Sequence, residues 1–310
     1  MPNIKEIAKK EELFTGGHRL CTGCGAGIMA RQTLLAVDKP VVIANATGCL
    51  EVATTIFPYT SWKVNWFHSA FENAAATISG IEAAYRSLKK QGKISDDIRF
   101  IAFGGDGGTY DIGFQALSGA VERGHRFLYI CYNNEAYMNT GVQRSSATPR
   151  GAHTTTEPVG NVKQGKSNFR KDLTKIMVAH NIPYVAQAVV GYWNDFMTKV
   201  QKAIEKDGPT FINVLQPCRL GWAYPPEITT ELGRLAVETC IWPIYEVENG
   251  KYKINRRPAA KKPVEEFFKA QGRFKHLLKP ENAELLKSIQ EEVDKNWEAL
   301  LKLETPSAGA

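Results

Sequence analysis

Five short stretches of the chain are almost continuously apolar and rich in β-branched or aromatic residues. They are Val41–Ala44, Arg99–Phe103, Phe127–Tyr132, Tyr184–Val189 and Thr210–Leu215. Runs of this length that lead into turn residues are typical of strands buried on both faces of a sheet. The pattern therefore predicts buried strands at these positions.

Longer segments with a different period separate these strands. Asn73–Gln91, Ile112–Arg123 and Trp193–Lys206 repeat apolar residues every three or four positions, which predicts amphipathic helices. Strands that alternate with helices favour right-handed crossovers, and hence an α/β fold with a doubly wound parallel sheet covered by helices on both faces. In such sheets ligands bind at the carboxyl ends of the strands, so functional residues are expected in the turns there.

The composition changes after residue 250. Residues 1–250 carry the alternating pattern and are predicted to form the binding domain, whereas residues 251–310 are rich in Lys, Arg and Pro and are predicted to form a C-terminal extension. The extension ends in a predicted helix over Pro280–Leu303, whose apolar stripe packs either on this chain, as we expect, or on a neighbouring subunit. Residues 144–170 lack periodicity and are predicted to form a long surface loop.

Composition and charge narrow the functional classes. Of the 310 residues, 43% are apolar and 23% are charged, which is ordinary for a folded globular protein. The net charge of +7 comes from basic residues scattered over several segments, so it does not indicate nucleic-acid binding. No apolar run approaches the ~20 residues that span a bilayer, and the N-terminal residues do not resemble a secretion signal. We therefore expect a cytoplasmic protein without membrane contact.

Two strand ends carry residues that suit a diphosphate and its metal ion. The first turn reads Gly104-Gly105-Asp106-Gly107-Gly108, and the second reads Asn133-Asn134. Glycines let backbone N–H groups approach a phosphate closely. Mg²⁺ prefers oxygen ligands, which Asp106, Asn134 and the backbone carbonyl of Ala136 would supply.

The two turns together distinguish a cofactor site from a purely structural turn. Taken alone, the glycines would only form a tight turn, with Asp106 capping the next helix. A Rossmann dinucleotide site is not expected, because Tyr110 stands where the Gly-x-Gly-x-x-Gly spacing requires glycine. Gly105-Asp106-Gly107 followed by Asn133-Asn134 resembles the cofactor motif of thiamine-diphosphate enzymes, which favours the functional interpretation.

Four of the six cysteines lie in turns that one edge of the sheet would bring together. Cys21 and Cys24 form a Cys-x-x-Cys turn, Cys49 follows the first strand, and Cys218 follows the strand that ends at Leu215. Four thiolates suit either Zn²⁺ or a [4Fe–4S] cluster, and the ligand count alone does not separate the two. A Cys-x-x-Cys redox pair is a third alternative, disfavoured because no strand leads into it. The other two cysteines fall in apolar stretches and are expected to be buried: Cys131 and Cys240.

Longer motifs resemble one family. Over roughly residues 15–245, and again near Phe267–Leu277, the chain resembles the β subunits of pyruvate:ferredoxin oxidoreductases, which belong to the 2-oxoacid:ferredoxin oxidoreductases. The motifs that carry the resemblance are Gly17-His18-Arg19-Leu20-Cys21-Thr22-Gly23-Cys24-Gly25, Ala46-Thr47-Gly48-Cys49, Phe57-Pro58-Tyr59-Thr60-Ser61-Trp62, Gly105-Asp106-Gly107 and Asn134-Glu135-Ala136-Tyr137-Met138-Asn139-Thr140-Gly141.

The resemblance implies a set of site residues. A [4Fe–4S] cluster would be held by Cys21, Cys24, Cys49 and Cys218, and Asn139 would face the substrate as the catalytic residue. Mg²⁺-bound thiamine diphosphate would be held by the residues of the two strand-end turns and their neighbours. These contacts are Thr47, Gly48, Gly105, Asp106, Gly107, Asn134, Ala136 and Thr140, of which Asp106, Asn134 and Ala136 also bind Mg²⁺.

The resemblance also implies a reaction and partner chains. The enzyme would oxidatively decarboxylate pyruvate with coenzyme A to acetyl-CoA and CO₂, and the cluster would pass the electrons towards ferredoxin. The partners would be a pyrimidine-side α subunit that supplies the activating glutamate, a γ subunit and a ferredoxin-like δ subunit. Glu51 and Glu72 are local candidates for that glutamate, but a surface or capping role is expected for Glu72, and a structural role for His68.

Two other functions stay open on the sequence. The same chemistry would serve oxalate, 2-oxoisovalerate or 2-oxoglutarate, because most of the substrate pocket would belong to a partner. Alternatively, the chain would be a non-catalytic electron-transfer or zinc-scaffold subunit. The presence of both Asp106 and Asn134 disfavours that alternative, because a scaffold has no need for Mg²⁺ ligands.

Overall fold

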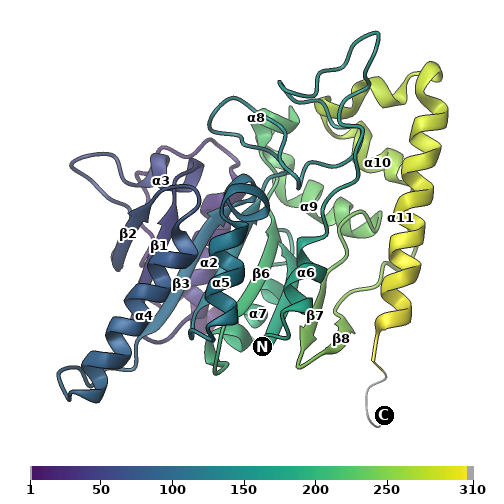
Figure 1. The fold of residues 1–310 in the computed structure, drawn as a ribbon. Helices are drawn as coiled ribbons and strands as arrows, with labels where there is room; N and C mark the ends of the chain where they lie inside the picture. The colour runs from purple at the N-terminus through teal and green to yellow at the C-terminus, as the bar shows by residue number, and fades with distance from the viewer. Residues whose placement is uncertain (1, 306–310) are drawn as a thin grey trace.

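One eight-stranded sheet organises the chain (Figure 1). The computed structural model describes residues 2–305. The strands are β1 (Val41–Ala46), β2 (Asn65–Ser69), β3 (Arg99–Gly105), β4 (Leu128–Asn133), β5 (Tyr184–Val189), β6 (Thr210–Leu215), β7 (Tyr245–Glu248) and β8 (Lys251–Ile254). Their order is β2-β1-β3-β4-β6-β5-β7-β8, and only β7 and β8 join antiparallel to their neighbours. The predicted α/β fold with a doubly wound, largely parallel sheet is confirmed.

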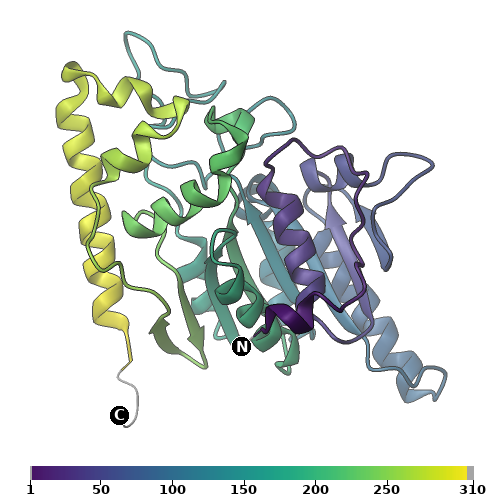
Figure 2. The ribbon, with the colours of Figure 1, turned by 180° about the vertical axis from the view of Figure 1, so that it is seen from behind.

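Helices cover both faces of the sheet. They are α1 (Ile4–Ile7), α2 (Gly25–Ala36), α3 (Cys49–Thr54), α4 (Ala74–Lys90), α5 (Phe114–Glu122), α6 (Leu173–Ala179), α7 (Trp193–Glu205), α8 (Arg219–Trp222), α9 (Thr229–Glu238), α10 (Val264–Lys269) and α11 (Ala283–Leu303). Figure 1 shows α4, α5 and α6 in front of the sheet, whereas α2 and α7 lie behind it and face the viewer in Figure 2. No helix within residues 2–305 combines the length and the apolar character that a bilayer crossing requires.

The central strands supply a separate core to each face. Successive residues of a strand point to opposite sides, so Ile101 and Phe103 pack with α2 and α7, whereas Phe100 and Ala102 pack with α4 and α5. All six residues of β4 are buried. Burial on both faces explains why the sequence of these strands is continuously apolar rather than alternating.

The edges of the sheet were not predicted from the sequence. Strand β2 is largely exposed, and β7 and β8 form a hairpin rich in charged residues. Exposed edge strands commonly carry charge, which blunts their pairing with other chains and also hides them from a search for apolar runs. Strand β8 belongs to this sheet although it lies beyond residue 250.

A third core joins the C-terminal segment to the sheet. The apolar stripe of α11, including Ile289 and Val293, packs with Trp222, Phe267 and Phe274, so the expected packing of this helix on its own chain is confirmed. Residues 144–170 run between this core and the sheet. They lack helices and strands, but Ser145, Thr148 and Lys166 are buried, so the prediction of a surface loop is wrong for part of the segment.

Candidate cofactor and cluster sites

The candidate site lies at the carboxyl ends of the central strands, at the upper edge of the sheet in Figure 1. Strands β3 and β4 pair in register, with Gly105 opposite Tyr132, so the residues that follow the two strands are neighbours. The backbone N–H of Asn134 accordingly donates to Asp106 Oδ1 at 3.2 Å. The topology of a parallel sheet thus brings together two turns that are far apart in the sequence.

One cavity collects every predicted contact of thiamine diphosphate. The residues of this cavity, called here the diphosphate cavity, include the predicted catalytic residue as well. Those that the sequence had identified are Thr47, Gly48, Gly105, Asp106, Gly107, Asn134, Ala136, Asn139 and Thr140. The structure adds neighbours that the sequence had not indicated: Phe71, Tyr132 and Tyr137.

Glycine is required in the turn that follows β3. A Cβ atom on Gly107 would lie 2.3 Å from the ring of Tyr137, and one on Gly108 would lie 2.7 Å from the carbonyl oxygen of Phe71. A π-helical turn over Gly107–Ile112 begins directly after Asp106, earlier than the helix predicted to start at Ile112. Its first N–H groups, which have no partner within the helix, suit an anion.

Asp106 is buried, and its carboxylate is held from two sides. Its side chain receives the N–H of Asn134 on Oδ1 and the hydroxyl of Ser145 on Oδ2, at 2.5 Å. Burial raises the pKa of Asp106 to about 7, although both hydrogen bonds favour the charged form. A cation beside this carboxylate would offset the cost of burying its charge.

The orientation of the Asn134 side-chain amide determines whether the site can bind a cation. One end of the amide lies 2.9 Å from Asp106 Oδ1 and 2.8 Å from the carbonyl oxygen of Ala136, and the other end lies 3.0 Å from Gln216 Nε2. If the nitrogen faces the two oxygens, it donates to both. If the oxygen faces them, three oxygens converge at spacings close to the edge of a Mg²⁺ octahedron, about 2.9 Å for bonds of 2.0–2.1 Å.

The orientation in which the Asn134 oxygen faces Asp106 and Ala136 also offers a hydrogen-bond partner to an unpaired atom. Gln216 Oε1 is buried without a hydrogen-bond partner among the described residues. With Asn134 in this orientation, a turn of the Gln216 amide alone would let this oxygen accept from the Asn134 nitrogen. The residues present therefore fit a magnesium ion.

The four predicted cluster ligands line a second cavity of about 360 Å³, called here the cysteine cavity. Cys21 and Cys24 come from the turn before α2, Cys49 begins α3, and Cys218 precedes α8. Burial, and then the other cysteines, raise the pKa of Cys49 to about 12, and burial raises that of Cys24 to about 11. Cationic iron or zinc would balance the charge of thiolates in such a place.

The two cavities are adjacent. Cys49, Asn134 and Asn139 line both of them, so a few side chains separate the diphosphate cavity from the cysteine cavity. Within residues 2–305, no three His, Cys, Asp or Glu side chains lie close enough to hold a single metal ion. The two remaining cysteines, Cys131 and Cys240, are buried in apolar cores, as predicted.

The local candidates for acid–base chemistry make structural contacts. His68 Nε2 lies 2.8 Å from Thr47 Oγ1 and 3.7 Å from Glu51 Oε2, which fits the structural role expected for His68. The backbone of Glu72 packs against Gly113, beside the π-helical turn. Neither Glu51 nor Glu72 lines the diphosphate cavity.

Several residues of the site were not recognised in the sequence. They include Ser145, which binds Asp106, and Glu135, a buried carboxylate between two of the predicted magnesium ligands. Lys166 donates to the carbonyl oxygens of Ser145, Ser146 and Thr148 and so braces the segment that carries Ser145. These residues lie in segments without a regular apolar pattern, so the sequence alone does not show that they are buried.

Known proteins resemble the chain both in sequence and in fold. A family model described as "Thiamine pyrophosphate enzyme, C-terminal TPP binding domain" matches residues 46–214. The pyruvate synthase subunit PorB of Methanocaldococcus jannaschii is 60% identical over 284 residues, which cover 91% of this chain and 95% of the relative. The ketoisovalerate oxidoreductase subunit VorB of Pyrococcus abyssi is 47% identical over 295 residues, covering 94% of each chain.

A solved structure shares the fold. The 2-oxoglutarate:ferredoxin oxidoreductase from Magnetococcus marinus aligns with a TM-score of 0.53 and 21% identity, over 64% of this chain and 63% of that one. The family expected from the sequence motifs is confirmed by the family model and by the relatives. The chain therefore belongs to the thiamine-pyrophosphate enzymes and, within them, to the pyruvate synthase PorB family of 2-oxoacid:ferredoxin oxidoreductase subunits.

Proposed function

We propose that this chain is the diphosphate-binding β subunit of a pyruvate:ferredoxin oxidoreductase. The observation that carries the proposal is the common wall of the two cavities. A cavity with a magnesium-type oxygen set adjoins a cavity lined by four thiols, and Cys49, Asn134 and Asn139 contribute to both. Decarboxylation followed by transfer of single electrons needs such an arrangement, because the electron acceptor must lie close to the carbon that is oxidised.

The diphosphate cavity would hold thiamine diphosphate through Mg²⁺. Asp106, Asn134 and the carbonyl of Ala136 would bind the ion, and the N–H groups at the start of the π-helical turn would face the phosphates. When bound, thiamine diphosphate supplies the nucleophilic carbon and electron sink that decarboxylation of a 2-oxoacid requires. The ring of Tyr137, whose hydroxyl donates to the carbonyl of Gly107 at 2.9 Å, would fix the turn around the diphosphate.

The cysteine cavity would hold a [4Fe–4S] cluster. A single zinc ion lies about 2.3 Å from each sulfur and fills the space between its ligands. The four thiols here instead line, with other side chains, a cavity of about 360 Å³, which leaves room for the larger group. In that position Cys21, Cys24, Cys49 and Cys218 would be deprotonated by the iron.

Asn139 would act on the substrate. It lines both cavities, which supports a position for its amide between the proposed cofactor and the proposed cluster. The amide nitrogen would donate a hydrogen bond to the oxygen of the 2-oxo group and orient it for attack. An uncharged donor suits this task, because it does not alter the charge of the neighbouring thiolates.

Partner subunits would complete the site. Among the described residues that line the diphosphate cavity, Asp106 is the only carboxylate, and it would be occupied by the metal. The glutamate that activates the pyrimidine ring would therefore come from an α subunit. A γ subunit and a ferredoxin-like δ subunit would complete the complex, with coenzyme A as acyl acceptor and ferredoxin as electron acceptor.

Pyruvate is the proposed substrate, because the relative that is 60% identical is a pyruvate synthase subunit. Ketoisovalerate is the second candidate, since a ketoisovalerate oxidoreductase subunit is 47% identical over 94% of the chain. The test is anaerobic reduction of ferredoxin by the purified complex with coenzyme A, offered pyruvate, 2-oxoisovalerate, 2-oxoglutarate or oxalate separately. Preference for another acid would change the substrate, and no reduction with any acid by a complex that retains both cofactors would refute the function.

A further inference from the structure

Glu135 is a buried carboxylate inside the metal-binding turn. It lies between Asn134 and Ala136, its side chain is 1% exposed, and its backbone adopts a left-handed conformation with φ of 68°. Such a conformation is unfavourable for a residue with a Cβ atom and persists only where the surroundings hold it. Something other than local preference must therefore maintain this turn.

Two arginines from distant segments hold the carboxylate. Arg170, which precedes α6, binds Glu135 Oε1, and Arg273, from the 3₁₀ segment Gly272–Leu278, donates to Glu135 Oε2 at 2.5 Å. Each guanidinium also lies over an indole ring: Arg170 over Trp242 at 5.2 Å and Arg273 over Trp222 at 3.8 Å. Planar guanidinium groups are suited to bind a carboxylate and an aromatic face together.

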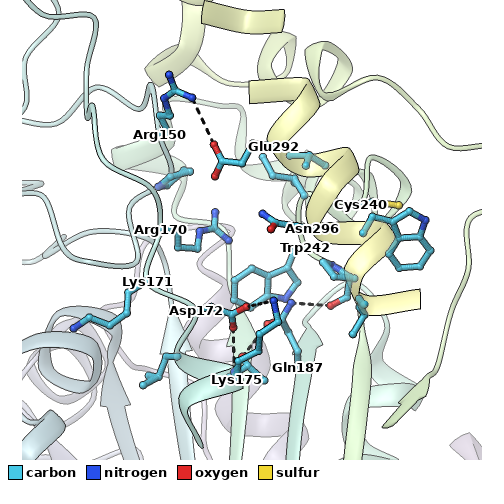
Figure 3. Close-up of a pocket in the computed structure, with 18 of the residues that line it drawn as sticks. Arg150, Arg170, Lys171, Asp172, Lys175, Gln187, Cys240, Trp242, Glu292 and Asn296 are labelled. Carbon is cyan, nitrogen blue, oxygen red and sulfur yellow. Dashed lines mark hydrogen bonds and ion pairs between the residues drawn. The ribbon is translucent and has the colours of Figure 1, made fainter. Parts of the chain in front are cut away.

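Figure 3 shows the surroundings of Arg170. Arg170 projects between the segment that carries Arg150 and the helix that carries Glu292, with Trp242 close by. These residues line a cavity of about 130 Å³ between α6 and α11. Arg170 lines this cavity and not the diphosphate cavity.

Other side chains fix the backbone of the same turn. Trp222 Nε1 donates to the carbonyl oxygen of Asn134 at 2.8 Å, and Thr148 Oγ1 donates to that of Glu135 at 2.6 Å. The next carbonyl, that of Ala136, faces the Asn134 amide in the proposed metal site. Contacts to Glu135 therefore determine where two of the three oxygens lie.

We infer that Glu135, Arg170 and Arg273 are positioning residues for the metal ion, and that the C-terminal segment takes part in cofactor binding through Arg273. The inference rests on the proposed function, since it concerns the proposed magnesium site. Groups behind a metal ligand orient it, and their substitution typically lowers metal affinity by about 10- to 100-fold. Glu135 does not contact the ion; it acts through the backbone on either side.

The test is Mn²⁺ binding to the assembled complex after removal of divalent metal, followed by electron paramagnetic resonance. The variants are Glu135→Gln and Arg273→Lys, the second of which keeps the charge but loses the planar fork. The matched control is Glu246→Gln. Glu246 lies on strand β7, which is separated from β4 and the metal turn by two other strands, and its buried carboxylate accepts hydrogen bonds from Lys202 and Tyr184. The visible absorbance of the cluster reports folding of the adjoining site.

We expect the Kd for Mn²⁺ to rise by about tenfold or more in both variants, with the cluster retained and the control equal to wild type. Unchanged Mn²⁺ affinity in Glu135→Gln would overturn the inference. So would an equal loss in the control, or loss of the cluster together with Mn²⁺ in both variants, because the three residues would then serve only general stability. Failure of the wild-type complex to bind Mn²⁺ would instead refute the metal site itself, and with it the proposed function.

Discussion

Asp106 lines only the diphosphate cavity, whereas Cys49 belongs to the wall shared with the cysteine cavity and is a proposed cluster ligand, so their substitution should separate the two cofactors. Asp106→Ala removes the only carboxylate of the proposed magnesium site, and we expect loss of bound thiamine diphosphate with iron and sulfide retained. Cys49→Ala removes one cluster ligand, and we expect the reverse. Analysis of thiamine, iron and sulfide in the purified complexes measures both results.

Loss of both cofactors from either variant would contradict this assignment, because it would show that the substitution disrupts the fold rather than one site. Cys131→Ala is the control for removal of a thiol. Cys131 is buried in the core beneath α4 and α5 and should not change the content of either cofactor.

Lys166 should make stability depend on pH. Burial lowers its pKa to about 8 in the folded chain, from a usual value near 10.5. Below pH 8 the side chain is charged in both states and burial of the charge destabilises the fold; between pH 8 and 10.5 the folded chain releases the proton first, so stability rises. We expect the wild type to gain up to about 1.4 kcal/mol per pH unit over Lys166→Met in that range.

Chemical denaturation of wild type and Lys166→Met at several pH values between 7 and 10.5 checks this slope. The comparison uses the difference between the two proteins, because other groups titrate in both. Identical slopes would show that water reaches Lys166 in solution and that its charge is not buried.

At the residue scale, the sequence indicated which residues would bind metal ions, but not which residues hold them in place. Asp106, Asn134, Cys49 and Cys218 could be proposed as metal ligands because their types and strand-end positions match the needs of a metal ion, and Cys21 and Cys24 because of their Cys-x-x-Cys spacing. Ser145, Glu135 and Arg273 were not, because their roles arise from contacts with residues remote in the sequence: Arg273 lies 138 residues from Glu135. No periodicity or local motif encodes such a distance.

Among the elements, the turn before α2 is tightly constrained by its neighbours. Gly23 lies in it between two of the predicted cluster ligands, with φ of 74°, and its carbonyl accepts from Thr229 Oγ1 at 2.7 Å. A Cβ atom here would lie 2.5 Å from the carbonyl oxygen of Pro226. The turn is thus packed against the segment between α8 and α9, close behind Cys218.

Gly23→Ala should therefore displace the turn and lower the iron content of the complex. Gly17→Ala is the matched control: Gly17 also has positive φ, 88°, but a Cβ atom there would meet nothing within 4 Å. Both variants bear the backbone penalty of about 1–2 kcal/mol, and only Gly23→Ala adds the collision. Equal iron content in the two would show that the contact with Pro226 does not position the cysteines.

The elements that the sequence predicted best are those buried on both faces. The strands β1, β3, β4, β5 and β6 are almost continuously apolar because both of their faces are buried, and the helices α4, α5 and α7 have a clear helical period because one side of each packs on the sheet. The edge strands β2 and β8 escaped prediction, since solvent relaxes the demand for apolar residues at the edges, and β7 escaped it because two of its four residues are glutamates.

For the whole molecule, an exposed aromatic loop indicates where a partner docks. Phe57 is 94% exposed and Tyr59 is 78% exposed, on the loop between α3 and β2 at the upper left of Figure 1, near the carboxyl edge of the sheet. Large exposed aromatic side chains beside a functional site are typical of an interface. We expect the proposed α subunit to cover this loop.

Phe57→Ser combined with Tyr59→Ser should weaken assembly of the complex without unfolding the chain. Ile4→Ser is the control, because Ile4 is also exposed, at 66%, but lies in the N-terminal helix α1. Sedimentation of the complex at a series of concentrations measures dissociation. Assembly equal to that of the control would exclude the loop from the interface.

The contact between Glu135 and Arg273 also sets an order for biosynthesis. Ribosomes add about 5–20 residues per second, so the 138 residues between these partners take about 7 to 28 seconds to make. During that interval the nascent chain already contains the metal turn but lacks one of the arginines that hold it. Stable insertion of the metal and its cofactor is thus expected only after translation of the C-terminal segment, however early the sheet itself folds.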